Sequence, residues 1–338
     1  MTRWARRAIT IPLYFIATLV IIPGLPIGLS ISLLADLAQR KKLARTRFIL
    51  FAALYFVCES MGILASFLVW VVSGGPFAAR STHWVKRNYT LQRYWSGALF
   101  HGVCFLYKLD FTVSGDACLS DSDTPIILFM RHASIADTVL PSHFLTAQHG
   151  YILRYVMKSE LLWDPCLDIV GHRLPDFFVH RKAGDSKQIQ GIVNLLDGLG
   201  HRQGIFIYPE GTRFSRQKQK DILEKIKTRQ PEVYEKVKGL KNILPPRFGG
   251  AIGLLQRNES ADVVFCVHTG FESANHFVEF VNGSLINQKI HISFQRIRFK
   301  DIPTERDDQI DWLIHNWIQM DAWLESKAKN AGVQRVEQ

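Results

Sequence analysis

A histidine and an aspartate lie five positions apart in the segment RHASIADT, which spans residues 131–138. A histidine can take a proton from an attacking hydroxyl when a carboxylate fixes its tautomer and stabilises its cation. His132 and Asp137 are therefore candidates for a catalytic base and its orienting partner. On one continuous helix, side chains five residues apart diverge by about 140° around the axis. The two can meet only if His132 precedes the helix.

The same segment also has a purely structural interpretation. Ser134 is a favourable N-cap, and Asp137 three residues later completes a pattern typical of a capping box, in which the acid accepts a backbone N–H. With Ser134 at the cap, His132 lies in the loop that leaves the preceding apolar run and Asp137 lies in the first turn. Both interpretations stay open here, because the same helix start allows either.

A second stretch that could bind or react is YPEGTRF, which spans residues 208–214 at the end of another apolar run. Gly211 has conformational freedom, Thr212 supplies a hydroxyl, and Arg213 carries a planar fork that matches a phosphate. The structural alternative is an ordinary turn with a surface ion pair between Glu210 and Arg213.

These stretches need an α/β framework to bring them together. From Trp84 onward, short apolar runs rich in β-branched and aromatic residues alternate with helical patterns. Ligands bind where strands end at one edge of such a sheet, so FFVHRKAGD (177–185) and ILPPRFGGA (243–251) are further candidate segments. Apolar stripes within 189–199 and 310–324 are expected to pack in the core. The predicted strands are Phe111–Val113, Ile126–Met130, Phe177–His180, Ile205–Tyr208, Val263–His268, Phe277–Val281 and Ile290–Phe299.

The first eighty residues have a different character. Residues 8–35 contain no charged residue and residues 48–79 contain only Glu59, so each run exceeds the roughly 20 residues that cross a bilayer as a helix. A signal peptide would have one shorter apolar core, so we predict a retained membrane anchor. Pro23 and Pro26 interrupt the first run. Two arrangements stay open: two spanning helices, or a re-entrant hairpin held by one anionic leaflet.

Composition narrows the class of partner. Lysine and arginine outnumber aspartate and glutamate by 41 to 30, which favours an anionic partner. The apolar runs indicate a membrane surface, and the absence of a recognised nucleic-acid-binding module argues against nucleic acid. Five scattered cysteines without Cys-x-x-Cys spacing indicate neither a disulfide framework nor a zinc site, which fits a cytosol-facing domain. We expect no metal.

The order of these segments resembles the glycerophospholipid acyltransferase superfamily, which includes 1-acylglycerol-3-phosphate and lysophospholipid acyltransferases. His132 and Asp137 match its first motif, and 210–213 matches all of its Glu-Gly-Thr-Arg motif. Arg181 stands where the second motif carries its arginine, and 244–247 resembles the proline-containing fourth motif. The similarity covers most of residues 110–327. Arg131 departs from the family, in which asparagine often precedes the histidine.

The resemblance implies a fold and a reaction. The fold is a single mixed-sheet α/β acyltransferase domain flanked by helices over residues 80–330, between a two-helix membrane anchor at 1–79 and a polar tail at 331–338. The reaction moves a fatty acyl group from acyl-CoA or acyl carrier protein to a lysophospholipid, most directly 1-acylglycerol-3-phosphate giving phosphatidate. The domain would lie on the cytoplasmic face of the membrane, with His132 as base and Asp137 orienting it.

The same resemblance implies roles for other residues. Arg131 and Lys158 are expected to contact the acceptor headgroup. No cofactor is implied, because acyl-CoA or acyl carrier protein is a co-substrate. The acceptor's phosphate is expected to bind Arg181, Glu210, Gly211, Thr212 and Arg213.

Several alternatives remain on the sequence alone. Glycerol-3-phosphate or another lysophospholipid is the alternative acceptor within the same reaction. A membrane lipid hydrolase would need a nucleophile, and Ser134 lies beside His132, although the sequence has no Gly-x-Ser-x-Gly elbow. A non-catalytic lipid-binding protein would have no need of an intact His132 and Asp137.

Overall fold

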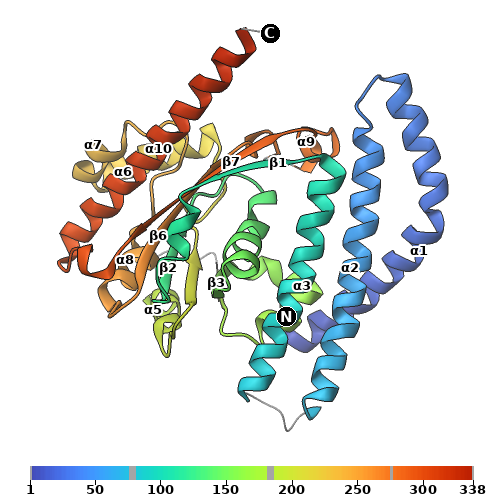
Figure 1. The fold of residues 1–338 in the computed structure, drawn as a ribbon, viewed down its shortest axis with the longest axis horizontal. Coiled ribbons are helices and arrows are strands. Elements are labelled where there is room, and N and C mark those ends of the chain that lie inside the picture. The colour runs from blue at the N-terminus through green and yellow to red at the C-terminus, as the bar shows by residue number, and fades with distance from the viewer. Residues whose placement is uncertain (1, 76–80, 181–185, 275–276, 337–338) are drawn as a thin grey trace. The chain divides into compact units, whose positions relative to one another are not determined.

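The computed structural model describes residues 2–75, 81–180, 186–274 and 277–336. The chain divides into two compact units, both of which contain helices and strands (Figure 1). The predicted α/β class is therefore confirmed, whereas the domain boundaries predicted at 79 and 330 stay predictions. The first unit comprises Met1–Asp110, Val139–Arg181 and His276–Gln288, and the second comprises Phe111–Thr138, Lys182–Asn275 and Lys289–Gln338.

A mixed sheet is the core of the second unit, with strand order β1-β7-β6-β2-β5. Strand β2 pairs in parallel with β5 and β6, and β6 pairs antiparallel with β7. All residues of β2 are buried, which explains its uninterrupted apolar sequence, because a strand covered on both faces has no solvent-facing position. The carboxyl ends of β2, β5 and β6 lie at one edge of the sheet. The bounds are β1 Asp110–Ser114, β2 Ile126–Met130, β5 Gln203–Ile207, β6 Asp262–Thr269 and β7 Lys289–Ile297.

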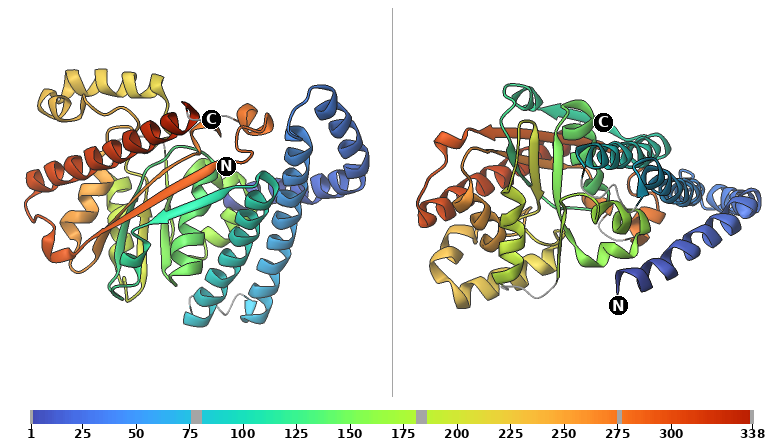
Figure 2. Two further views of the ribbon diagram at one scale, coloured as in Figure 1. Left: turned by 45° about the horizontal axis from the view of Figure 1, so that its top comes forward. Right: turned by 90° about the horizontal axis from the view of Figure 1, so that it is seen from below.

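Five α-helices belong to the second unit. Helices α5 and α8 pack closely at the glycines of α8. A Cβ added at Gly249 or Gly253 would lie only 3.1 Å from the Ile189 side chain of α5. The predicted apolar stripe of α10 is buried in the core, where Trp317 donates from Nε1 to the carbonyl of Leu244 at 2.8 Å. Helix α7 contacts both α6 and α10 (Figure 2). The bounds are α5 Ser186–Val193, α6 Arg216–Arg229, α7 Pro231–Val237, α8 Phe248–Arg257 and α10 Arg306–Val336.

Three long helices dominate the first unit: α1 (Arg3–Ala38), α2 (Ala44–Val72) and α3 (Thr82–Tyr107). Helix α2 packs against both of the others. The unit also contains a parallel pair of strands and two short helices. Their bounds are β3 Ile152–Lys158, β4 Phe177–Val179, α4 Pro165–Gly171 and α9 Phe277–Val281.

Helices α1 and α2 are long and apolar enough to cross a membrane. Helix α1 contains Pro12, Pro23 and Pro26 and continues through them, but it is bent (Figure 1), as expected where proline removes a backbone hydrogen bond. Its apolar side chains are largely exposed, among them Leu19 and Leu34. An exposed apolar surface on two such helices suggests membrane association.

Polar contacts fasten these helices to the rest of the first unit. Arg6 and Arg7 both bind the buried Asp168 of α4, at 2.7 and 3.0 Å. Burial acts to raise the pKa of Asp168, but hydrogen bonds from His172 and the arginines outweigh it and lower that pKa to about 2. In α2, Glu59 accepts a hydrogen bond from the Trp95 indole of α3 at 2.9 Å. The amino end of α1 and the middle of α2 are thus held by polar groups of the protein.

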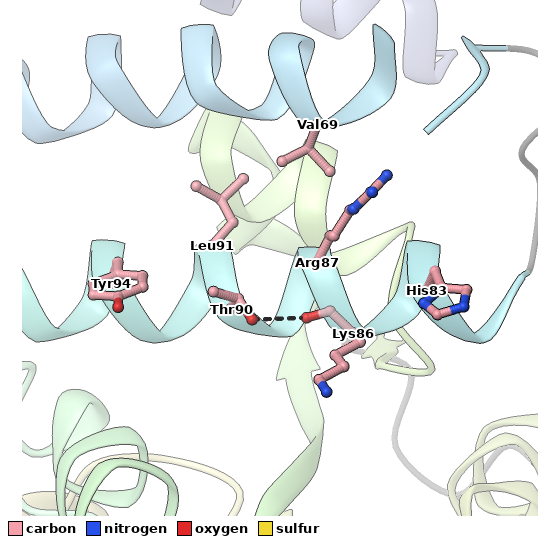
Figure 3. Close-up of a pocket in the computed structure, with 7 residues that line it drawn as sticks. All are labelled: Val69, His83, Lys86, Arg87, Thr90, Leu91 and Tyr94. Atoms are coloured by element: carbon pink, nitrogen blue, oxygen red, sulfur yellow. Dashed lines mark hydrogen bonds between the residues drawn. The ribbon is translucent and has the colours of Figure 1, made fainter. Parts of the chain in front are cut away.

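A groove of about 450 Å³ lies between α2 and α3 (Figure 3). Val69 and Leu91 supply apolar lining, and Lys86 supplies a cation. Arg87 points toward α2 and donates to the Val72 carbonyl at 3.1 Å, so it satisfies the carboxyl end of that helix. The groove contains none of the predicted site residues.

Two elements differ from the sequence prediction. Phe277–Val281 is the helix α9 and not a strand. The Phe280 ring packs against the rings of Tyr107 and Phe51 of the long helices, with centroid distances of 4.8 and 5.2 Å. A short apolar segment can bury its side chains in this way as a helix or as a strand. Strand β3 was not predicted, because Arg154 interrupts its apolar pattern.

Candidate active site

His132 lies in the loop directly after β2, as predicted. Its backbone is held from both sides by the loop that follows β5. The N–H of His132 donates to Glu210 Oε1 at 2.8 Å, and its carbonyl accepts from the Phe214 N–H at 2.8 Å. The side chain is therefore fixed beside the segment 208–214, and His132 is 8% exposed.

Asp137 faces His132 across the first turn after this loop. Its Oδ1 lies 3.0 Å from His132 Nδ1, and its Oδ2 accepts the backbone N–H groups of Ala133 and Ser134 at 2.7 and 2.8 Å. One carboxylate thus satisfies both interpretations of the sequence, the pairing with histidine and the capping of the turn. The helix that begins here is only the short 3₁₀ segment Ala136–Val139.

The protonation of the pair follows from these contacts. Asp137 is fully buried, and burial by itself acts to raise its pKa. The charge and hydrogen bonds of His132 and His268 outweigh burial and lower the pKa of Asp137 well below its usual range. A neutral imidazole beside this carboxylate carries its proton on Nδ1. Nε2 of His132 is then left with a lone pair that can accept a proton.

Two residues that the sequence did not indicate also contact Asp137. The Tyr208 hydroxyl donates to Oδ1 at 3.0 Å, and the Tyr208 ring stacks on the His132 ring at a centroid distance of 4.0 Å. His268 Nε2 lies 3.4 Å from Oδ2. Tyr208 follows β5 and His268 lies near the end of β6, the two strands that flank β2. The sequence signal that could have indicated both residues is a polar side chain at the end of a strand predicted to lie beside β2.

Glu210 connects three loops. It is fully buried, and while Oε1 accepts from His132, Oε2 accepts the Leu244 N–H at 3.1 Å. Burial raises the pKa of Glu210 to about 8. A buried carboxyl group whose oxygens both accept backbone N–H groups positions the loops and does not face a phosphate. It is also no partner of Arg213 in a surface ion pair.

The other residues of this motif form a basic surface. Gly211 has φ +65°, and a Cβ there would lie 3.0 Å from Arg247 Nε, so only glycine fits without strain. Lys218 donates to the Thr212 hydroxyl at 3.2 Å and to the Arg213 carbonyl at 3.1 Å. Partial burial and the charge of Arg213 lower the pKa of Lys218. This arrangement of like charges favours binding of an anion.

Arg131 does not have its predicted position. Its side chain is only 1% exposed, and it donates to Glu272, to the His268 carbonyl at 2.5 Å and to the Asn242 carbonyl at 2.9 Å. A side chain with this burial and these partners cannot contact a lipid headgroup. The prediction for Arg131 was wrong, because its burial depends on partners such as Glu272 and Asn242 that are more than a hundred residues away in sequence.

The remaining predicted residues are Lys158 and Arg181. Lys158 is exposed at the end of β3 in the first unit, and its contact with a headgroup stays a prediction. Arg181 lies outside the described residues. Within the described ranges, no group of three or more His, Cys, Asp or Glu side chains could hold a metal ion. The expectation of no metal stays an expectation.

Comparison with known proteins agrees with this geometry. Residues 110–248 match the family model described as Acyltransferase, and this range contains both His132 and 210–213. The fold is similar to the crystal structure of the 1-acyl-sn-glycerophosphate (LPA) acyltransferase PlsC from Thermotoga maritima, with a TM-score of 0.51 and 14% identity over 81% of this chain and 96% of that chain. Residues 110–248 therefore match an acyltransferase domain, and these similarities support the glycerophospholipid acyltransferase superfamily.

A curated relative agrees with this family match. An uncharacterized acyltransferase from Schizosaccharomyces pombe is 24% identical over an alignment of 203 positions, and the match covers 54% of this chain and 53% of that protein. The chain thus spans about half the length of the curated relative it matches.

We predict that Glu210→Gln lowers both the melting temperature and the turnover of the acyltransferase. The amide nitrogen replaces one acceptor oxygen, so the N–H of His132 or Leu244 is buried without a partner. Such a group costs about 1–3 kcal/mol. Thermal unfolding of the purified protein and its acyl-transfer rate measure the two effects.

Glu259→Gln is the matched control, because Glu259 is an exposed glutamate of the second unit. It should leave both properties unchanged. A Glu210→Gln variant as stable and active as the control would show that Glu210 does not hold these loops.

Proposed function

We propose that this acyltransferase moves a fatty acyl group from acyl-CoA or acyl carrier protein to the hydroxyl of a lysophospholipid, most directly 1-acylglycerol-3-phosphate giving phosphatidate. The observation that carries the proposal is the His132–Asp137 pair, 3.0 Å apart, in a loop bonded to the one that carries Arg213. A base that can deprotonate an alcohol therefore lies beside cations that can bind a phosphate.

The reaction uses Nε2 of His132 as the base. Nε2 takes the proton of the acceptor hydroxyl while that oxygen attacks the thioester carbonyl of the acyl donor. Asp137 keeps the ring oriented and stabilises the imidazolium that forms, as in hydrolase triads. The tetrahedral intermediate then breaks its carbon–sulfur bond, and His132 returns the proton to the leaving thiolate. No acyl-enzyme is needed, because the alcohol attacks directly.

The phosphate of the acceptor is assigned to the basic surface of residues 211–213. The guanidinium of Arg213 can donate two parallel hydrogen bonds to a phosphate. Gly211 and Thr212 shape the loop. The family motif alone assigns Arg181 to the same phosphate. Glu210 supports the same surface by holding the loop in place.

A hydrolase is the less favoured function. Ser134, the one nucleophile beside His132 in the sequence, is fully buried, and its hydroxyl donates to the Ala274 carbonyl at 2.7 Å. That hydroxyl is directed at a structural partner and not at His132. A non-catalytic lipid-binding protein would not need a buried, ionised Asp137, which is costly to maintain.

We further propose that α1 and α2 anchor the protein in one leaflet, with the catalytic residues on the cytoplasmic side. Arg6 and Arg7 are bound to Asp168, and Glu59 is bound to Trp95, so these segments face polar protein groups where a spanning helix would face lipid. The acceptor and product are both lipids, so such an anchor keeps the enzyme at its substrate.

The acyl-transfer proposal is tested with purified protein in lipid nanodiscs and labelled acyl-CoA or acyl carrier protein. We expect transfer to 1-acylglycerol-3-phosphate, and a loss of turnover of about 10²–10⁴ in His132→Ala. Arg213→Ala should raise KM for 1-acylglycerol-3-phosphate more than for lysophosphatidylcholine, because only the former presents a phosphate monoester.

Arg306→Ala, at an exposed arginine of α10, is the control for lost positive charge. Glycerol-3-phosphate as the preferred acceptor would replace the proposed substrate. Release of free fatty acid without acyl transfer would indicate a hydrolase, and lack of any turnover would indicate a lipid-binding protein.

The anchor proposal is tested by labelling a cysteine placed at the exposed Lys42, between α1 and α2. In sealed vesicles, an impermeant maleimide should reach this site from the same side as a cysteine at Glu259, in a background whose native cysteines are replaced by serine. Labelling of the Lys42 site from the opposite side would show two spanning helices.

A further inference from the structure

We propose that Tyr208 and His268 are positioning residues that set how tightly His132 holds its proton, by sharing the charge of Asp137. This inference rests on the proposed function, because it concerns the same base. It adds two residues from the strands on either side of β2 to the pair that the family motif defines.

Tyr208 contacts both members of the pair at once. Its hydroxyl donates to Asp137 Oδ1 at 3.0 Å, the same oxygen that lies 3.0 Å from His132 Nδ1. Its ring lies over the His132 ring with an interplanar angle of 19°. The hydroxyl therefore competes with His132 for the negative charge on Oδ1, while the ring packs against one face of the imidazole.

His268 approaches the other carboxylate oxygen from β6. Its Nε2 lies 3.1 Å from the Arg131 carbonyl and 3.4 Å from Asp137 Oδ2. The Arg131 carbonyl can only accept, so Nε2 carries the proton and donates it to that carbonyl, while the same N–H lies beside Asp137 Oδ2 and acts on its charge. Nδ1 has no hydrogen-bond partner among the described residues, and the side chain is fully buried. Burying an imidazole with an unsatisfied nitrogen costs free energy, so a histidine that served only to fill the core would be unfavourable here. We therefore assign the role of His268 to the N–H donor at its Nε2.

Hydrogen bonds from the buried Arg131 side chain hold the backbone of His268 in position. Arg131 donates to the His268 carbonyl at 2.5 Å and binds Glu272, whose other oxygen accepts the Gly270 N–H at 2.7 Å. The end of β6 is thereby tied to the end of β2. His268 and Asp137 consequently keep their separation when a substrate binds.

The charge of Asp137 is thus divided among several donors. Other titratable groups that act on this carboxylate are Cys266 of β6 and Glu210 after β5, and Arg131 acts on Glu210. Each donor withdraws charge that would otherwise stabilise a protonated His132. The contacts of Asp137 are Ala133 N, Ser134 N, His132 Nδ1, Tyr208 Oη and His268 Nε2.

The sign of the effect follows directly. When a donor to Asp137 is removed, the carboxylate interacts more strongly with the imidazolium, so His132 holds its proton to a higher pH. The acid limb of kcat/KM, which reports the free enzyme, must then move to higher pH. A purely structural role for either residue would lower the rate and leave the position of this limb unchanged.

Tyr208→Phe is the first test, because it removes the hydroxyl and keeps the ring that stacks on His132. We expect the acid limb of kcat/KM to rise by roughly half a pH unit to one unit, so that kcat/KM well below this limb falls by about three- to tenfold. Tyr107→Phe is the matched control, since Tyr107 is a buried tyrosine of the first unit whose hydroxyl has no hydrogen-bond partner in the part of the chain that the structure describes. It should keep the wild-type profile.

His268 is tested with two variants of the full chain in nanodiscs. His268→Phe keeps a ring but removes the donor, and it should shift the acid limb in the same direction as Tyr208→Phe. His268→Gln keeps an N–H donor near Nε2 and should restore most of the wild-type profile. Thermal unfolding of each variant distinguishes a loss of fold from a change in the proton affinity of His132. If His268→Phe does not fold, Tyr208→Phe still tests the inference.

The outcomes distinguish this inference from the proposed function. If the wild type transfers acyl groups and Tyr208→Phe keeps the wild-type acid limb, the inference is wrong and the acyltransferase proposal stands. A shift to lower pH would also overturn it. If the wild type shows no acyl transfer, the proposed function fails and the inference fails with it.

Discussion

The site depends on one buried negative charge. Asp137 is inaccessible to solvent, and a carboxylate without water must be stabilised by hydrogen-bond donors from the protein. These donors come from the loop after β2, from the residue after β5 and from the end of β6. The need to satisfy this one group therefore fixes the relative positions of three strand ends, and with them the ring of His132.

A second buried carboxyl group extends this constraint to the loop that carries Arg213. Glu210 accepts the N–H of His132 on one side and that of Leu244 on the other, so the loops after β2 and β5 and the segment before α8 move together. Arg213 follows three residues later, and the Phe214 N–H returns to the His132 carbonyl. The backbone positions of His132 and Arg213 are in this way fixed relative to each other.

Much of this arrangement could be predicted from the sequence, because it depends on local patterns. The apolar run Ile126–Met130 predicts a buried strand, and the spacing of His132 and Asp137 requires a loop and a turn between them. The contributions of Tyr208 and His268 could not be predicted, since they depend on which strands flank β2. The burial of Arg131 was missed for the same reason, because its partners Glu272 and Asn242 are more than a hundred residues away in sequence. Phe277–Val281 has a pattern compatible with strand or helix, and only its packing decides.

The central claim is that Asp137 holds His132 with the proton on Nδ1 and leaves Nε2 as the base. Nitrogen NMR of the full-length protein with ¹⁵N-labelled histidine tests it directly, with the His132 signals assigned by their loss in His132→Gln. The account predicts that neutral His132 carries hydrogen on Nδ1 and none on Nε2, and that Asp137→Asn abolishes this preference. A neutral His132 protonated on Nε2 in the wild type, or a preference unchanged by Asp137→Asn, would contradict it.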